Sequence, residues 1–153
     1  MESDDNNSAS SADQLAQAAA SAMWAEDKAS AGLGMQIEAV GEGWSRLSMT
    51  VREDMVNGLD ICHGGFVFAL ADSAFAFACN SHNLAAVAAG VSIDFLRPAK
   101  RGDRLVAQAQ VVNQSKRSGL YDIVVRNQMD QVIGQVRGRS MRIGGPVIKE
   151  QTV

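Results

Sequence analysis

The stretch Asn57-Gly-Leu-Asp-Ile-Cys-His-Gly-Gly65, continued by the apolar run Phe66–Cys79, decides the fold of this chain. The opening Asn-Gly pair is typical of a turn, and the pattern predicts a helix over Gly64–Asn80. This helix is apolar nearly all round, so we expect it to be buried on most sides. It is too short to span a bilayer, and Asp72 interrupts it.

Six segments around this helix have the patterns of strands. The clearest is Trp44–Arg52, where apolar and polar residues alternate with period two. The predicted strands cover residues 35–40, 44–52, 86–96, 104–114, 119–129 and 131–143. The sequence therefore predicts an α+β fold in which an antiparallel sheet of about six strands wraps around one long central helix.

Charge is unevenly distributed along the chain. Residues 97–149 contain 11 of the 14 Lys and Arg residues and three acids, whereas residues 1–96 are acidic. A basic surface can hold an anion, although ordinary solvated strand faces also carry such charges. Aromatic residues make up 5% of the chain and are not interleaved with basic ones, so nucleic-acid binding is not indicated.

The cysteines and the first residues indicate a cytoplasmic protein. Cys62 and Cys79 cannot form a disulfide framework, and the polar, acidic start does not look like a signal peptide. A reducing compartment is the default for such a protein. Two cysteines and two histidines without ligand-like spacing predict no metal site. We also expect no cofactor and no membrane association.

Asp72 is the first candidate for chemistry. A carboxylate among apolar helix residues is costly to bury without a partner, so it is either a hydrogen-bonded structural residue or a functional one. Burial is expected to raise its pKa. The pair Gly64-Gly65 is the second candidate, because the first amides of a helix have no partner within it and lie at the positive end of its dipole. A glycine there lets a carbonyl oxygen approach, as in an oxyanion hole, although two glycines can also simply form a turn.

The spacing of these candidates has a consequence for assembly. Eight residues separate Gly64 from Asp72, which corresponds to about 12 Å along a helix axis. A single carbonyl carbon cannot contact both groups of one chain. Two such helices packed antiparallel across a two-fold axis would bring Asp72 of one chain to Gly64 of the other. The chemistry therefore requires at least a dimer.

Two runs of the chain resemble a known family. The runs NGLDICHGGFVFALADSAFAFACNS (57–81) and GVSIDFLRPAKRGD (90–103) are similar to those of the PaaI-type hotdog acyl-CoA thioesterases of phenylacetate degradation. The resemblance covers about residues 22–145, which we predict to form a hotdog domain. Residues 1–21 are predicted to be a disordered tail, although residues 13–31 have helical spacing, and residues 146–153 are predicted to be a C-terminal tail. The resemblance implies hydrolysis of an acyl-CoA thioester, with phenylacetyl-CoA or a hydroxylated aromatic acyl-CoA as the substrate. It also implies a homotetramer that is built as a dimer of dimers.

The resemblance also implies roles for single residues. Asp72 has the position of the catalytic carboxylate, acting as general base or as nucleophile, and Gly64 has the position of the amide that polarises the thioester carbonyl. Asn57 matches an asparagine that assists at the carbonyl or the water, and His63 begins the helix and fixes the loop. Ser92 matches a strand serine that orients water in related human-type hotdog thioesterases, across a two-residue difference in length.

Basic residues supply candidates for the phosphates of CoA, and arginine suits forked contacts with phosphate. These candidates are Arg97, Lys100, Arg101, Lys116, Arg117, Arg137 and Arg139. The aromatic residues that could line an acyl pocket, or else pack in the core, are Trp44, Phe66, Phe68, Phe75 and Phe77.

Other functions stay open at this point. A non-enzymatic acyl-CoA-binding hotdog protein would bind without turnover, and a hotdog hydratase or dehydratase would pair His63 with Asp72 and release no thiol. A nucleophilic Cys62 activated by His63 is disfavoured, because adjacent residues point in different directions.

Overall fold

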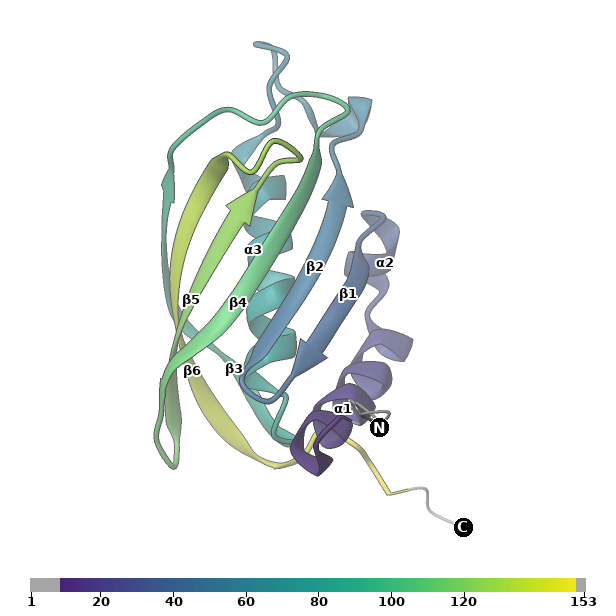
Figure 1. Cartoon of the computed structure of the whole chain (residues 1–153), viewed down its shortest axis with the longest axis vertical. Helices are drawn as coiled ribbons and strands as arrows, with labels where there is room; N and C mark the ends of the chain where they lie inside the picture. The colour runs from purple at the N-terminus through teal and green to yellow at the C-terminus, as the bar shows by residue number, and fades with distance from the viewer. Residues whose placement is uncertain (1–8, 151–153) are drawn as a thin grey trace, which may run out of the picture.

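A computed structural model describes residues 9–150 of the chain, and its centre is the helix α3 (Gly64–Cys79). The predicted helix Gly64–Asn80 is thus confirmed to within one residue. Figure 1 shows α3 lying along the concave side of a sheet that curves around it. The buried positions of α3 include both Leu70 and Ala78, so the helix is covered along most of its length.

The sheet has six strands in the order β1-β2-β4-β5-β6-β3, and all neighbours are antiparallel. The strands are β1 (Gln36–Gly41), β2 (Trp44–Thr50), β3 (Leu84–Phe95), β4 (Arg104–Gln114), β5 (Ser118–Arg126) and β6 (Val132–Pro146). A short 3-10 helix, η1 (Glu53–Met55), follows β2. All six predicted strands are confirmed with small differences at their ends, and so is the wrapped α+β architecture.

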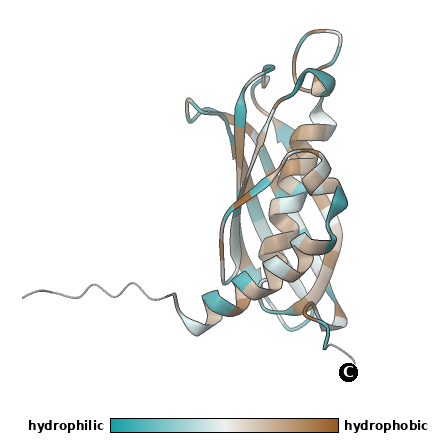
Figure 2. Ribbon diagram, turned by 90° about the vertical axis from the view of Figure 1, so that its right-hand side faces the viewer, coloured by the Kyte–Doolittle hydropathy of each residue, from teal (hydrophilic) through white to brown (hydrophobic). Residues whose placement is uncertain are grey.

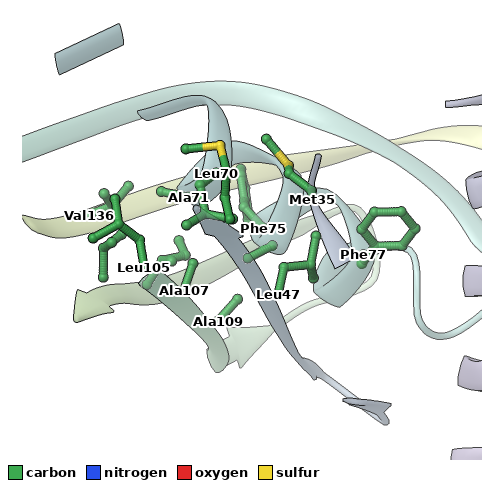
Figure 3. Close-up of a cluster of buried hydrophobic side chains, with 14 of the residues drawn as sticks. Met35, Leu47, Leu70, Ala71, Phe75, Phe77, Leu105, Ala107, Ala109 and Val136 are labelled. Carbon is green, nitrogen blue, oxygen red and sulfur yellow. The ribbon is translucent and has the colours of Figure 1, made fainter. Parts of the chain in front are cut away.

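The core lies between α3 and the concave face of the sheet. Figure 3 shows Leu70, Ala71 and Phe75 of α3 among strand residues such as Leu47 and Ala107. Small residues on the strands make room for the large ones of the helix. At Gly138 of β6 a Cβ atom would stand 2.8 Å from Phe75 Cε1, so glycine is needed there for close packing.

The predicted disordered tail over residues 1–21 is wrong for residues 11–21, which belong to the helix α1 (Ser11–Glu26). Ser10 caps this helix by accepting a hydrogen bond from the Asp13 amide at 3.1 Å. Asp13 Oδ1 in turn accepts one from the Glu42 amide at 2.9 Å, which ties α1 to the β1–β2 turn. The face of α1 that is buried against the rest of the domain consists of small residues, Ala16, Ala19 and Ala20. The part of the predicted tail over residues 1–8 lies outside the described residues.

The predicted single helix over residues 13–31 is divided at Asp27. This residue ends α1 and caps α2 (Lys28–Gly32), accepting from the Ser30 amide at 2.9 Å. Figure 2 shows the molecule from the side, with the helices gathered along one side of the sheet. At the other terminus, β6 extends through Pro146, and the Ile148 amide donates to Asn83 Oδ1 at 2.8 Å. The predicted C-terminal tail is therefore attached to the domain up to this point.

The two edges of the sheet differ in how they are covered. The edge strand β1 lies beside α1. The edge strand β3 has a neighbour, β6, on one side only, and most of its residues are exposed, including Val87 and Val91. Within residues 9–150, none of the helices has the length and apolar character needed to span a bilayer.

Candidate active site at the start of the central helix

The first turn of α3 leaves one backbone amide free. His63 is the cap, and its Nδ1 accepts the N–H of Gly65 at 3.0 Å. The N–H of Phe66 donates to the His63 carbonyl at 2.9 Å. In residues 9–150 the N–H of Gly64 has no hydrogen-bond partner. The cap therefore leaves the Gly64 amide as an available donor at the positive end of a 16-residue helix.

Gly64 has an ordinary helical backbone, and its lack of a side chain leaves room for a neighbouring aromatic ring. A Cβ atom at residue 64 would stand 2.9 Å from Phe95 Cζ and 3.1 Å from Phe95 Cε1. The tip of the Phe95 ring thus rests on Gly64. Phe95 lies at the end of β3 and is 54% exposed, so an aromatic surface borders the free amide.

Asp72 lies two turns further along α3, where the helix is not fully covered. Its side chain is half-buried, and burial raises its pKa above the ordinary value of an aspartate. No charge or hydrogen bond from another described residue offsets this effect. The residues on the same side of α3 are also incompletely buried, among them Gly65, Phe68 and Ala76. Asp72 therefore lies on a stripe of α3 that could face another molecule.

The loop before α3 supplies Asn57 and a cavity. Asn57 Oδ1 accepts the amides of Leu59 at 3.0 Å and Ile61 at 3.4 Å, so its carbonyl oxygen is used to shape the turn. Its side-chain NH₂ group is left for other acceptors. A cavity of about 450 Å³ opens beside this loop. It is lined by Asn57, Ile61, Cys62, Gly64, Val67, Phe95, Leu96, Arg97, Pro98, Ala99 and Ile133.

Comparison with known proteins identifies the family. The sequence model of the thioesterase superfamily matches residues 59–133. The acyl-coenzyme A thioesterase PaaI of Escherichia coli K12 is 49% identical over 131 residues, which cover 86% of this chain and 94% of the relative. The chain belongs to the thioesterase superfamily. A protein of Archaeoglobus fulgidus, described as a putative esterase, is 36% identical and covers 79% of each chain.

Solved structures of thioesterase-superfamily proteins share the fold. The structure of the E. coli PaaI protein, from the phenylacetic acid degradation operon, matches with a TM-score of 0.88 and 48% identity, covering 89% of this chain and 99% of that one. The TT0310 protein of Thermus thermophilus matches with a TM-score of 0.74 and 34% identity, covering 76% of this chain and 98% of that one. The predicted PaaI-type resemblance and the hotdog fold are therefore confirmed.

In this thioesterase-superfamily chain, the predicted site residues are brought together only in part. Gly64, His63 and Asn57 lie at one end of α3, and Asp72 lies in its middle. Ser92 is exposed on the open edge strand β3. In residues 9–150, no hydrogen bond joins the side chains of any two of these five residues.

The predicted CoA-binding cations are scattered. Arg97 lines the cavity beside Gly64, and Lys100 and Arg101 follow in the same loop. Lys116 and Arg117 lie in the β4–β5 turn, at the opposite end of the molecule from Gly64 (Figure 1). The two candidates on β6 differ in their partners. Arg137 donates to both carboxylate oxygens of Asp122, at 2.8 and 3.1 Å, whereas Arg139 lies against Gly90 of β3.

The aromatic candidates from the sequence mostly have other roles. Phe75 and Phe77 belong to the core, and Trp44 lies at the start of β2, far along the sheet from Gly64. Phe95 was missed, because a phenylalanine in a strand pattern carries no signal of its position beside a helix N-terminus. The pairing of β3 with β6 is what places it there.

The geometry argues against a Cys62 nucleophile. Cys62 is buried, and burial raises the pKa of its thiol, which keeps it protonated. Its Sγ donates to the backbone carbonyl of His63 at 3.5 Å rather than to the imidazole. Among residues 9–150, no group of three or more His, Cys, Asp and Glu side chains is arranged to hold a metal ion.

Proposed function

We propose that this protein hydrolyses acyl-CoA thioesters to a carboxylic acid and free CoA. The observation that carries the proposal is the free N–H of Gly64 at the start of α3, next to an amide that is already capped by His63. A donor held in this way can stabilise the oxyanion that forms when the thioester carbonyl is attacked. The relative named as an acyl-coenzyme A thioesterase in E. coli supports this choice of reaction.

Asp72 of a second subunit supplies the other half of the proposed site. Within one chain, Asp72 and Gly64 are about 12 Å apart along the helix axis, so both cannot act on one carbonyl carbon. The stripe of α3 that carries Asp72 consists mainly of small residues and is open, and the edge of β3 is unpaired. If a second subunit, related by a two-fold axis, covers both the stripe and the edge, the result is a dimer with two equivalent sites. By resemblance, we propose that two dimers form a tetramer.

The proposed chemistry needs no cofactor. The Asp72 carboxylate takes a proton from water, and the resulting hydroxide attacks the carbonyl carbon. The C–S bond then breaks, and the CoA thiolate takes up a proton. Alternatively, the carboxylate attacks directly and water hydrolyses the mixed anhydride. The NH₂ group of Asn57 and the hydroxyl of Ser92 position the thioester or the water.

The proposed substrate is an aromatic acyl-CoA such as phenylacetyl-CoA, by analogy with the phenylacetic acid degradation operon that encodes the E. coli relative. Arg97 lines the cavity, and Lys100 and Arg101 follow it in the same loop, so we propose these three as the first candidates for the CoA phosphates. The free thiols of Cys62 and Cys79 are compatible with the proposed cytoplasmic location.

The test is release of free thiol from a panel of acyl-CoAs by the wild type and by Asp72→Asn. We expect release from aromatic acyl-CoAs by the wild type and a loss of nearly all turnover in the variant, which keeps the shape of the side chain. A hydratase would release no thiol, and a binding protein would bind acyl-CoA without turnover. Full turnover by Asp72→Asn would refute the assignment of Asp72.

A further inference from the structure

We propose that the cavity beside Gly64 holds the acyl group of the substrate and that Phe95 selects aromatic acyl groups. This inference rests on the proposed thioesterase function and adds the residue that determines its substrate class. It starts from an unusual contact. Phe95 is 54% exposed, yet the tip of its ring lies only 2.9 Å from the position that a Cβ atom of residue 64 would take.

The contact places the ring at the reacting group. The N–H of Gly64 is two bonds from the position that Phe95 Cζ approaches to 2.9 Å. A carbonyl oxygen that accepts from this N–H at about 2.9 Å would therefore lie on the part of α3 that Phe95 borders. Because Gly64 and Phe95 both line the cavity, an acyl group that extends from that carbonyl into the cavity would meet the Phe95 ring.

The cavity chemistry favours the acyl group over the pantetheine arm of CoA. The lining around Phe95 is mainly apolar, with Ile61, Val67 and Ile133 among its members. A pantetheine arm carries two amide groups, and these would lose water there with few partners. An aromatic acyl group has no such groups to satisfy and fits within about 450 Å³.

No other aromatic side chain competes for this role in the described part of the cavity lining. Among the described residues that line the cavity, Phe95 alone is aromatic. Phe75 and Phe77 are 1% exposed and fill the core instead. An aromatic acyl group in the cavity thus meets the Phe95 ring in an offset or edge-to-face arrangement, which a linear alkyl group cannot form.

The test compares kcat/KM for thiol release from phenylacetyl-CoA and from hexanoyl-CoA. In Phe95→Leu we expect the ratio of the two values to fall about 2- to 12-fold, mainly through loss on the aromatic substrate. Phe95→Tyr keeps the ring and should keep the ratio. Leu59→Ala is the control, because Leu59 is an exposed apolar residue of the same loop region and does not line the cavity.

A second variant tests the cavity without changing Phe95. Ile61→Phe narrows the cavity, so it should lower turnover of phenylacetyl-CoA roughly 10-fold or more while sparing acetyl-CoA. Equal losses on both substrates, or an unchanged substrate ratio in Phe95→Leu, would overturn the inference. Failure of the thioesterase proposal gives a different result, namely no thiol release by the wild type or full release by Asp72→Asn.

Discussion

Replacing Gly64 by proline removes the N–H that we assign to the oxyanion while leaving the backbone almost undisturbed. Proline is favoured at the first position of a helix because that N–H has no helical partner. The preceding residue must be extended, and His63 already has φ −57° and ψ 132°. The fold therefore tolerates proline at this position.

The expected effect of Gly64→Pro on kcat has two parts, the loss of the N–H donor and the steric effect of the added carbon atoms. Loss of one oxyanion donor lowers kcat about 10²- to 10³-fold, or about 2.7–4 kcal/mol. The new Cβ atom would also press on Phe95 Cζ at 2.9 Å. Gly64→Ala introduces the same Cβ atom and keeps the N–H, so it measures the steric effect of that Cβ atom. Because the Phe95 ring is half exposed and can turn aside, we expect this steric cost to be about 1 kcal/mol or less.

The assay is steady-state thiol release from phenylacetyl-CoA by the wild type, Gly64→Ala and Gly64→Pro, with thermal unfolding of each. We expect Gly64→Pro to be slower than Gly64→Ala by about 100-fold or more, with both unfolding at similar temperatures. If the two variants had the same kcat, the Gly64 amide would not be the donor, and the mechanism would need another source of oxyanion stabilisation.

Three further predictions follow from the structure. Burial raises the pKa of Asp72 above its unfolded value, so the ionised form destabilises the fold once the pH exceeds the unfolded pKa. Asp72→Asn should therefore raise the melting temperature more at about pH 7 than at about pH 4, and an equal effect at both values would contradict this. Arg97→Gln should raise KM for acyl-CoA in a salt-dependent way, whereas Arg137→Gln should not, because Arg137 is already paired with Asp122. Deleting residues 1–21 should lower the free energy of unfolding by roughly 2–3 kcal/mol, since three alanines of α1 are buried; an unchanged urea midpoint would restore the view of this segment as a tail.

The central helix and its two candidates could be predicted because their signals are local. The turn before α3, the glycine at its start and the carboxylate at Asp72 all lie within one continuous stretch. Helix α1 was partly missed for the opposite reason. Its buried face is made of alanines, and an alanine-rich segment beside a polar tail has almost no contrast between its buried and exposed faces.

Phe95 illustrates what the sequence could not provide. It lies 31 positions after Gly64, and the two meet because β3 crosses to the far edge of the sheet and pairs with β6. Such a contact depends on strand order, which local patterns do not encode.

The same limit applies to Asp72 with greater force, because its proposed partner is the Gly64 amide of another chain. The spacing of two residues on one helix was enough to predict that a second subunit is needed, since the helical rise is fixed. Which side chains that subunit brings to the cavity depends on how the stripe of α3 and the edge of β3 are covered. Measuring the activity of mixed Asp72→Asn and Gly64→Pro subunits is the direct approach, because mixed dimers regain one intact site only if the two residues act across the interface.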